Sequence, residues 1–160
     1  MISLIFTLAT ASMVAVCMAA HRAGGTDEAA DLLVGAAMVA LLAASTVILS
    51  GITGIAFSRF PGTDLVALVL FGSAHRAAPA KWKVDLCFLL LGLLGVHAWY
   101  WGASDQGQAA LWNYILLKNV LFGSQVAVLS LEGVRSIVSA GHDRRRVFAR
   151  RPVPHVADVS

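Results

Sequence analysis

The feature that most constrains this chain is a set of four long apolar stretches that are nearly free of charged residues. They cover residues 2–20, 32–57, 86–102 and 109–131. An α-helix needs about 17–25 residues to cross a hydrocarbon core of about 30 Å, and each stretch approaches or exceeds that length. The sequence therefore predicts an all-α, polytopic membrane protein built as a four-transmembrane-helix bundle.

The composition agrees with this fold class. The chain is 58% hydrophobic and 13% charged, against about 25% charged residues in soluble domains. Four spans in 160 residues leave little for a separate soluble domain, so we expect one transmembrane domain over residues 1–135 and a basic tail over 136–160. The first stretch has no Lys or Arg before it, which a secretory signal would have, and we expect it to remain as a helix.

The charge of the connecting segments predicts the orientation. The connection before the second span is net negative, whereas basic residues gather between the second and third spans and after the fourth. Basic residues favour the cytoplasmic side of a cell membrane. Because an even number of spans returns the chain to its starting side, the sequence predicts a multi-pass protein of the inner or plasma membrane with both termini cytoplasmic.

A short apolar segment lies in the connection between the second and third spans. Residues 65–71 are uniformly apolar but far too few to cross a bilayer, and Pro61 precedes them. We expect a helix over about 64–73 that lies at the cytoplasmic interface. A re-entrant segment in a pore is the functional alternative.

The two turns on the predicted outer side resemble each other. Thr26 and Asp27 in the first, and Ser104 and Asp105 in the second, stand where an N-cap belongs. Their oxygens can accept hydrogen bonds from free amide groups, and the acidic group favours the positive end of the following helix.

Small residues recur at helical spacing along the first three spans. Lipid is as apolar as leucine, so membrane helices associate through close backbone approach, which small side chains permit. The positions predicted to pack helices together are Ala11, Ala15, Ala40, Ala44, Ser50, Gly54, Gly92 and Gly95.

Polar residues inside the predicted spans are the best candidates for a binding site, because they are costly in lipid. They are His97 in the third span and Lys118, Asn119 and Gln125 in the fourth. In an antiparallel pair of helices, His97 and Lys118 should lie about one turn apart in depth. The alternative is structural: Lys118 extends its amine toward the outer headgroups, and His97 forms a hydrogen bond to a neighbouring helix.

The sequence holds no pattern that we associate with catalysis or metal binding. It has no phosphate-binding loop and no His-Glu-x-x-His motif. The single deep histidine could pair in haem ligation only with His21. Cys17 and Cys87 are predicted near opposite membrane faces, too far apart for a disulfide.

Five arginines follow the last span and predict contact with the cytoplasmic lipid surface. An arginine near an anionic membrane contributes about 1 kcal/mol of attraction. The residues are Arg144, Arg145, Arg146, Arg150 and Arg151.

The combination of packing positions with no catalytic pattern predicts a non-enzymatic accessory or scaffold subunit of a larger membrane assembly. We expect membrane lipids and other membrane subunits or further copies of the chain as partners, and no nucleic acid, since the basic residues lie at membrane boundaries. The alternatives are an oligomeric channel or holin-like pore, and a redox subunit associated with haem or quinone. No cofactor is predicted for a scaffold subunit or for a channel or holin-like pore. Haem or quinone is expected only for the redox subunit.

Overall fold

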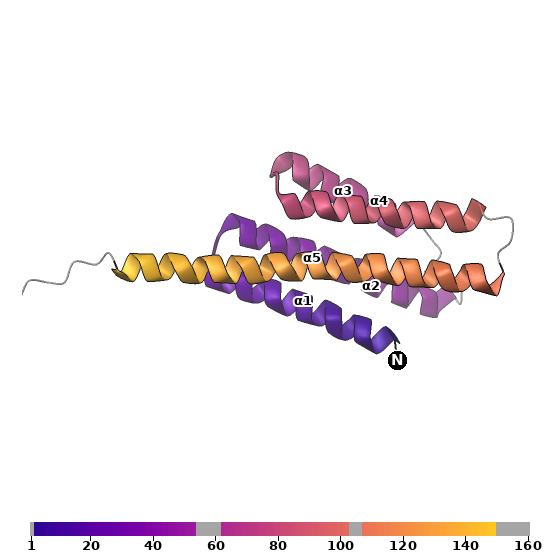
Figure 1. Cartoon of the computed structure of the whole chain (residues 1–160), viewed down its shortest axis with the longest axis horizontal. Coiled ribbons are helices and arrows are strands. Elements are labelled where there is room, and N and C mark those ends of the chain that lie inside the picture. Colours follow the sequence, from indigo (N-terminus) through magenta and orange to yellow (C-terminus); the bar gives the residue numbers. More distant parts are fainter. Residues whose placement is uncertain (1, 54–61, 103–106, 150–160) are drawn as a thin grey trace, which may run out of the picture.

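The computed structural model describes residues 2–53, 62–102 and 107–149, with their side chains except those of residues 2–4, 46–47, 49–53 and 144–149. The described residues form helices and no strands (Figure 1): α1 Ile2–Gly24, α2 Asp27–Thr53, α3 Gly62–Ala77, α4 Lys81–Gly102 and α5 Gln108–Ala149. Four of them, α1, α2, α4 and α5, are long and apolar enough to cross a membrane. This agrees with the predicted all-helical architecture and its four apolar spans.

The turn between α1 and α2 has the predicted capping chemistry. The hydroxyl of Thr26 accepts a hydrogen bond from the backbone N–H of Ala29 at 3.2 Å, which satisfies one of the free amide groups at the start of α2. Gly25 has a φ of 59°, a conformation that glycine adopts readily at the end of a helix. The corresponding cap in the second turn, Ser104, lies outside the described residues.

The first and last helices run side by side in the same direction. The rings of Phe6 and Phe122 meet edge to face with centroids 5.5 Å apart, and further along both helices the Cys17 thiol donates to the carbonyl of Leu129 at 3.7 Å. A Cβ added at Gly133 would lie 2.8 Å from the Cγ1 of Val16, so glycine at this position lets the two backbones approach closely.

Helix α3 runs antiparallel to α4 along most of its length. Near the start of α3, Asp64 contacts His97 toward the end of α4; near the end of α3, the carbonyl of Ala74 accepts from Lys83 at the start of α4. The outer face of α3 is apolar and exposed, with Leu65, Val66, Val69 and Leu70. This differs from the predicted interfacial helix: α3 lies lengthwise within the bundle.

Two turns that the predicted topology assigned to opposite membrane faces lie at the same end of the bundle. Lys83, just after the α3–α4 turn, forms an ion pair of 2.5 Å with Asp31, just after the α1–α2 turn. We call this end the basic end. Its basic residues on described side chains are Arg22, Arg76, Lys81, Lys83 and Arg135.

The two ends of the described chain lie at opposite ends of the bundle. Helix α1 begins at the end away from the basic end, whereas α5 finishes at the basic end and extends beyond the other helices (Figure 1). The sequence argument for both termini on one side counted four passes. Helix α3 adds a fifth antiparallel helix to the path of the chain.

Candidate functional site

A cavity of about 380 Å³ lies within the bundle, with lining residues from all five helices. Most of its wall is apolar, with contributions from Phe6, Val39, Leu90 and Phe122. A smaller group of polar side chains also faces it: Thr63, Asp64, Tyr114, Lys118, Asn119 and Gln125. An apolar cavity with a few convergent polar groups is the usual form of a small-molecule site.

A buried histidine joins three helices beside this cavity. His97 of α4 is 2% exposed. Its Nε2 lies 3.0 Å from Oδ2 of Asp64 on α3, and its Nδ1 lies 2.9 Å from the hydroxyl of Tyr114 on α5. The neutral tautomer with its hydrogen on Nε2 satisfies both contacts, because Nε2–H donates to the carboxylate and Nδ1 accepts from the hydroxyl. His97 therefore holds α3, α4 and α5 in register.

Lys118 has an acidic neighbour that sequence reasoning did not provide. Lys118 is half-buried and lines the same cavity as Asp64, a residue of opposite charge. A nearby charge of opposite sign lowers the cost of an ionised side chain in a membrane interior. The cavity wall thus carries one positive and one negative side chain.

Gln125 is the polar group of the cavity that has unsatisfied bonding capacity. Its side chain is 4% exposed, and its amide nitrogen has no hydrogen-bond partner among the described residues. A buried donor left without an acceptor costs about 1–3 kcal/mol. An acceptor placed in the cavity would remove that cost.

Three of the four polar residues predicted as a binding cluster line the cavity, and the fourth lies beside it. Lys118, Asn119 and Gln125 line the cavity. His97 stands behind it and acts through Asp64 and Tyr114. Sequence reasoning missed Asp64, because it was placed at the start of an interfacial helix.

Some of the predicted packing residues contact another helix, and others are exposed on the surface of the single chain. A Cβ added at Gly92 would contact Leu121 of α5 at 3.4 Å, whereas one added at Gly95 would meet nothing within 4 Å. Ala11, Ala15 and Ala44 are exposed in the single chain and Ala40 is half-buried. The exposed positions remain predicted contacts for a partner. Ser50, Gly54 and the five tail arginines, Arg144, Arg145, Arg146, Arg150 and Arg151, lie outside the described side chains.

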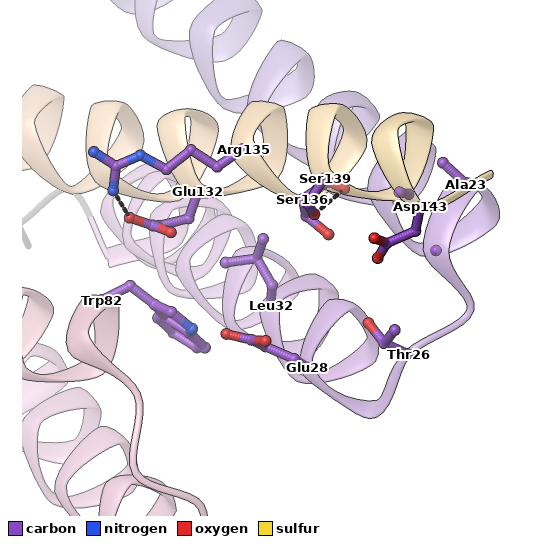
Figure 2. A pocket seen from close by; sticks show the side chains of 12 residues that line it. Ala23, Thr26, Glu28, Leu32, Trp82, Glu132, Arg135, Ser136, Ser139 and Asp143 are labelled. Atoms are coloured by element: carbon purple, nitrogen blue, oxygen red, sulfur yellow. Dashed lines mark hydrogen bonds and ion pairs between the residues drawn. The ribbon is translucent and has the colours of Figure 1, made fainter. Parts of the chain in front are cut away.

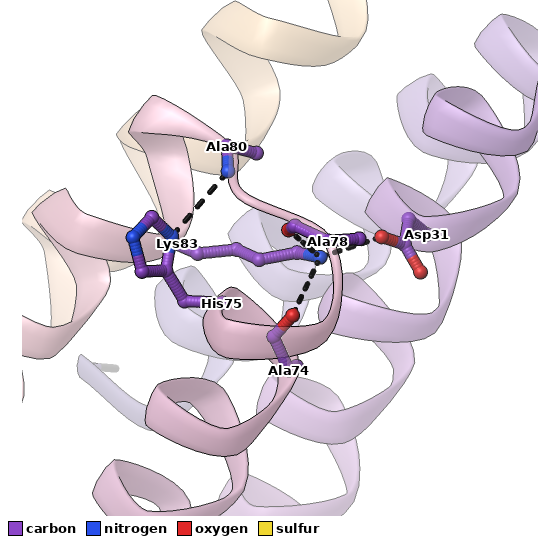
Figure 3. A network of polar contacts seen from close by, with 6 residues as sticks. All are labelled: Asp31, Ala74, His75, Ala78, Ala80 and Lys83. Carbon is purple, nitrogen blue, oxygen red and sulfur yellow. Dashed lines mark hydrogen bonds and ion pairs between the residues drawn. The ribbon is translucent and has the colours of Figure 1, made fainter.

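A second polar cluster closes the basic end (Figure 3). Lys83 is 1% exposed, and its Nζ donates to Asp31 at 2.5 Å and to the carbonyls of Ala78 and Ala74 at 2.9 and 3.3 Å. An ammonium group has three hydrogens, so its donor capacity is used in full. We call this cluster the Lys83 clamp, and it joins α2 to the α3–α4 turn.

The basic end also holds a larger surface cavity of about 590 Å³ between α1, α2, α4 and α5 (Figure 2). Of its carboxylates, Glu28 and Asp143 are exposed, and Glu132 forms an ion pair with Arg135 of the next turn. These groups are hydrated or already paired, so the cavity has the polar character of an ordinary protein surface.

The two histidines that could pair in haem ligation, His21 and His97, lie toward opposite ends of the bundle. His21 lies in the last turn of α1 at the basic end, whereas His97 lies toward the other end of α4 and both of its ring nitrogens are engaged. Among the described residues, no group of three or more His, Cys, Asp or Glu side chains is placed to hold a metal ion.

Comparison with protein-family models, with curated proteins and with solved structures finds no match for this chain. Its function is therefore inferred from the cavity and the groups that line it.

Proposed function

We propose that this chain is an integral membrane protein that binds a small lipid-soluble molecule in the cavity between its five helices. The observation that carries the proposal is an apolar cavity that adjoins the amide nitrogen of Gln125, a buried donor with no acceptor among the described residues. The cavity volume of about 380 Å³ falls within the range of about 300–1,000 Å³ typical of small-molecule sites. Its apolar wall favours a ligand that partitions into lipid.

The test compares two neighbouring alanines of α2. Ala43 lines the cavity, whereas Ala44 is exposed, so Ala43→Phe fills the cavity and Ala44→Phe makes the same change outside it. The probes are durene and duroquinone, two compact apolar molecules, measured by equilibrium dialysis against the protein in lipid nanodiscs with empty nanodiscs as the reference. We expect saturable binding to the parent chain and to Ala44→Phe, and its loss in Ala43→Phe.

Two results would contradict the proposal. One is that neither probe binds saturably to the parent chain above its partition into empty nanodiscs. The other is that Ala43→Phe binds the probes as well as the parent chain does, which would place binding elsewhere.

We further propose that the basic end faces the cytoplasm. The described residues at the opposite end include no Lys or Arg outside the interior of α5, and basic residues favour the cytoplasmic side. With five antiparallel helices this orientation places the start of α1 outside and the end of α5 inside. It replaces the expectation of two cytoplasmic termini and retains the cell membrane as the location.

Single cysteines distinguish the two topologies in a chain whose Cys17 and Cys87 are replaced by Ala. Asp27→Cys lies in the first turn, which is cytoplasmic in the five-helix arrangement and external in the four-span prediction. Gln108→Cys at the start of α5 is external in both. A membrane-impermeant maleimide added to intact cells should label Gln108→Cys and leave Asp27→Cys unlabelled; labelling of both would favour the four-span topology.

The functions predicted from sequence remain open to separate measurements. Native mass determination of the extracted protein tests the accessory-subunit prediction through its partners. Dye leakage from reconstituted vesicles tests the channel or holin-like alternative. Neither result depends on the ligand proposal.

A further inference from the structure

The charges of the cavity restrict the kind of ligand that it can hold. Asp64 and Lys118 both line it and carry opposite charges, while His97 satisfies its two contacts as a neutral ring. A charged ligand would add a charge without a counterion in a region of low dielectric constant, which is strongly unfavourable. Only an electrically neutral ligand leaves the net charge inside the cavity unchanged.

The hydrogen-bonding groups of the cavity specify one feature of that neutral ligand. The Gln125 amide nitrogen is a donor that has no acceptor among the described residues. Asp64 contacts His97 through one of its two carboxylate oxygens. The group on a ligand that matches the Gln125 amide nitrogen is an oxygen acceptor.

We propose that the ligand is a neutral, lipid-soluble carbonyl compound whose oxygen accepts a hydrogen bond from the Gln125 amide. This proposal rests on the proposed function, since it names the class of molecule that the same cavity binds. Lipid-soluble quinones and apolar esters or ketones share this chemistry: an uncharged carbonyl oxygen on a hydrophobic body. Binding involves no covalent or redox step.

A ligand of this class also explains why Gln125 is tolerated in the interior. A buried amide without a partner is destabilising. The apolar side chains Phe122, Leu90 and Phe71 form much of the wall. A carbonyl compound supplies the acceptor and fills the apolar volume at the same time.

The experiment compares probes that differ in oxygen and in charge. Duroquinone and durene share one carbon skeleton and differ in two carbonyl oxygens, and tetramethylbenzoate adds a negative charge to the same ring. We expect duroquinone to bind the parent chain about tenfold more tightly than durene and more tightly than tetramethylbenzoate. Equal affinities for the first two, or tighter binding of the third, would overturn the proposal.

Two glutamine variants assign the effect to a residue. Gln125→Met keeps the length of the side chain and removes the donor, and we expect it to weaken duroquinone binding about fivefold without weakening durene binding. Gln108→Met makes the same change at an exposed position and should alter neither. If Gln125→Met leaves duroquinone affinity unchanged, the amide does not contact the carbonyl and the proposal is wrong.

The outcomes separate this proposal from the one on which it rests. Binding of durene and duroquinone with equal affinity, lost in Ala43→Phe, would support the apolar cavity and overturn the carbonyl ligand. Absence of saturable binding for both probes would overturn the binding function itself.

Discussion

The Lys83 clamp and the cavity are both built from polar side chains inside an apolar bundle, yet they differ in how completely those groups are satisfied. Lys83 uses its hydrogens on one carboxylate and two backbone carbonyls. In the cavity, Gln125 has a donor without a partner among the described residues, and an open volume adjoins it. A buried polar network that is satisfied fixes structure, whereas one that is not has capacity left for a ligand.

The largest predicted effect comes from removing the Lys83 clamp, in which the donor capacity of the ammonium group is fully used. Lys83→Met should lower the free energy of unfolding by about 3 kcal/mol, because it removes the ion pair with Asp31 and leaves the carbonyl of Ala78 without its Lys83 donor. The carbonyl of Ala74 still accepts from the backbone N–H of Ala78. The figure lies at the low end for a buried pair because the Asp31 side chain is 46% exposed and stays hydrated. Thermal unfolding in detergent measures the change.

The control for this variant lies two residues away. Lys81→Met makes the same substitution at an exposed position of the same helix and should leave the unfolding temperature unchanged. Equal effects of the two variants would show that the clamp adds no stability.

An intermediate effect is expected at the residue that positions the cavity wall. His97→Phe keeps a ring of similar size but loses the hydrogen bonds to Asp64 and Tyr114, so we expect a loss of about 2 kcal/mol in unfolding free energy. Asp64 retains Lys118 as a neighbour, which makes the loss smaller than at the clamp. His142→Phe, at an exposed site of α5, is the matched control, and an equal response of both variants would contradict the assignment.

The smallest predicted effect is a gain in stability. It tests directly whether Gln125, unlike Lys83, lacks a hydrogen-bond partner. In the absence of ligand, Gln125→Met should stabilise the protein by about 1 kcal/mol, because it replaces a buried donor without an acceptor by an apolar side chain of similar length. The unfolding temperature of the ligand-free protein measures this gain. A clear loss of stability would mean that the amide has a structural partner, as Lys83 has.

The sequence was sufficient for the long helices and for a local cap, and insufficient for the way the helices meet. Apolar stretches of about 20 residues identify α1, α2, α4 and α5 on length alone, and the hydroxyl of Thr26 next to Asp27 predicts the cap that is observed. Both are local properties of the chain, and they depend on no contact between distant segments.

The site required information that no local pattern contains. Helix α3 has 16 residues, which is below the usual length of a membrane span, so its Asp64 was assigned to the interface. Charge counting by loops likewise separated Asp31 from Lys83, which form an ion pair. A signal that could have found Asp64 is the charge of Lys118, which lies in an apolar segment that has no carboxylate of its own.

The parallel packing of the first and last helices has a consequence for the order of assembly. Met13 and Cys17 of α1 are fully buried, and Cys17 meets α5 at Leu129. During synthesis α1 leaves the ribosome about a hundred residues earlier, so this face waits in the bilayer or against the insertion machinery until α5 arrives. Alkylation of the Cys17 thiol therefore reports whether α5 has packed against α1. The thiol is accessible in a nascent chain and is shielded once α5 has docked.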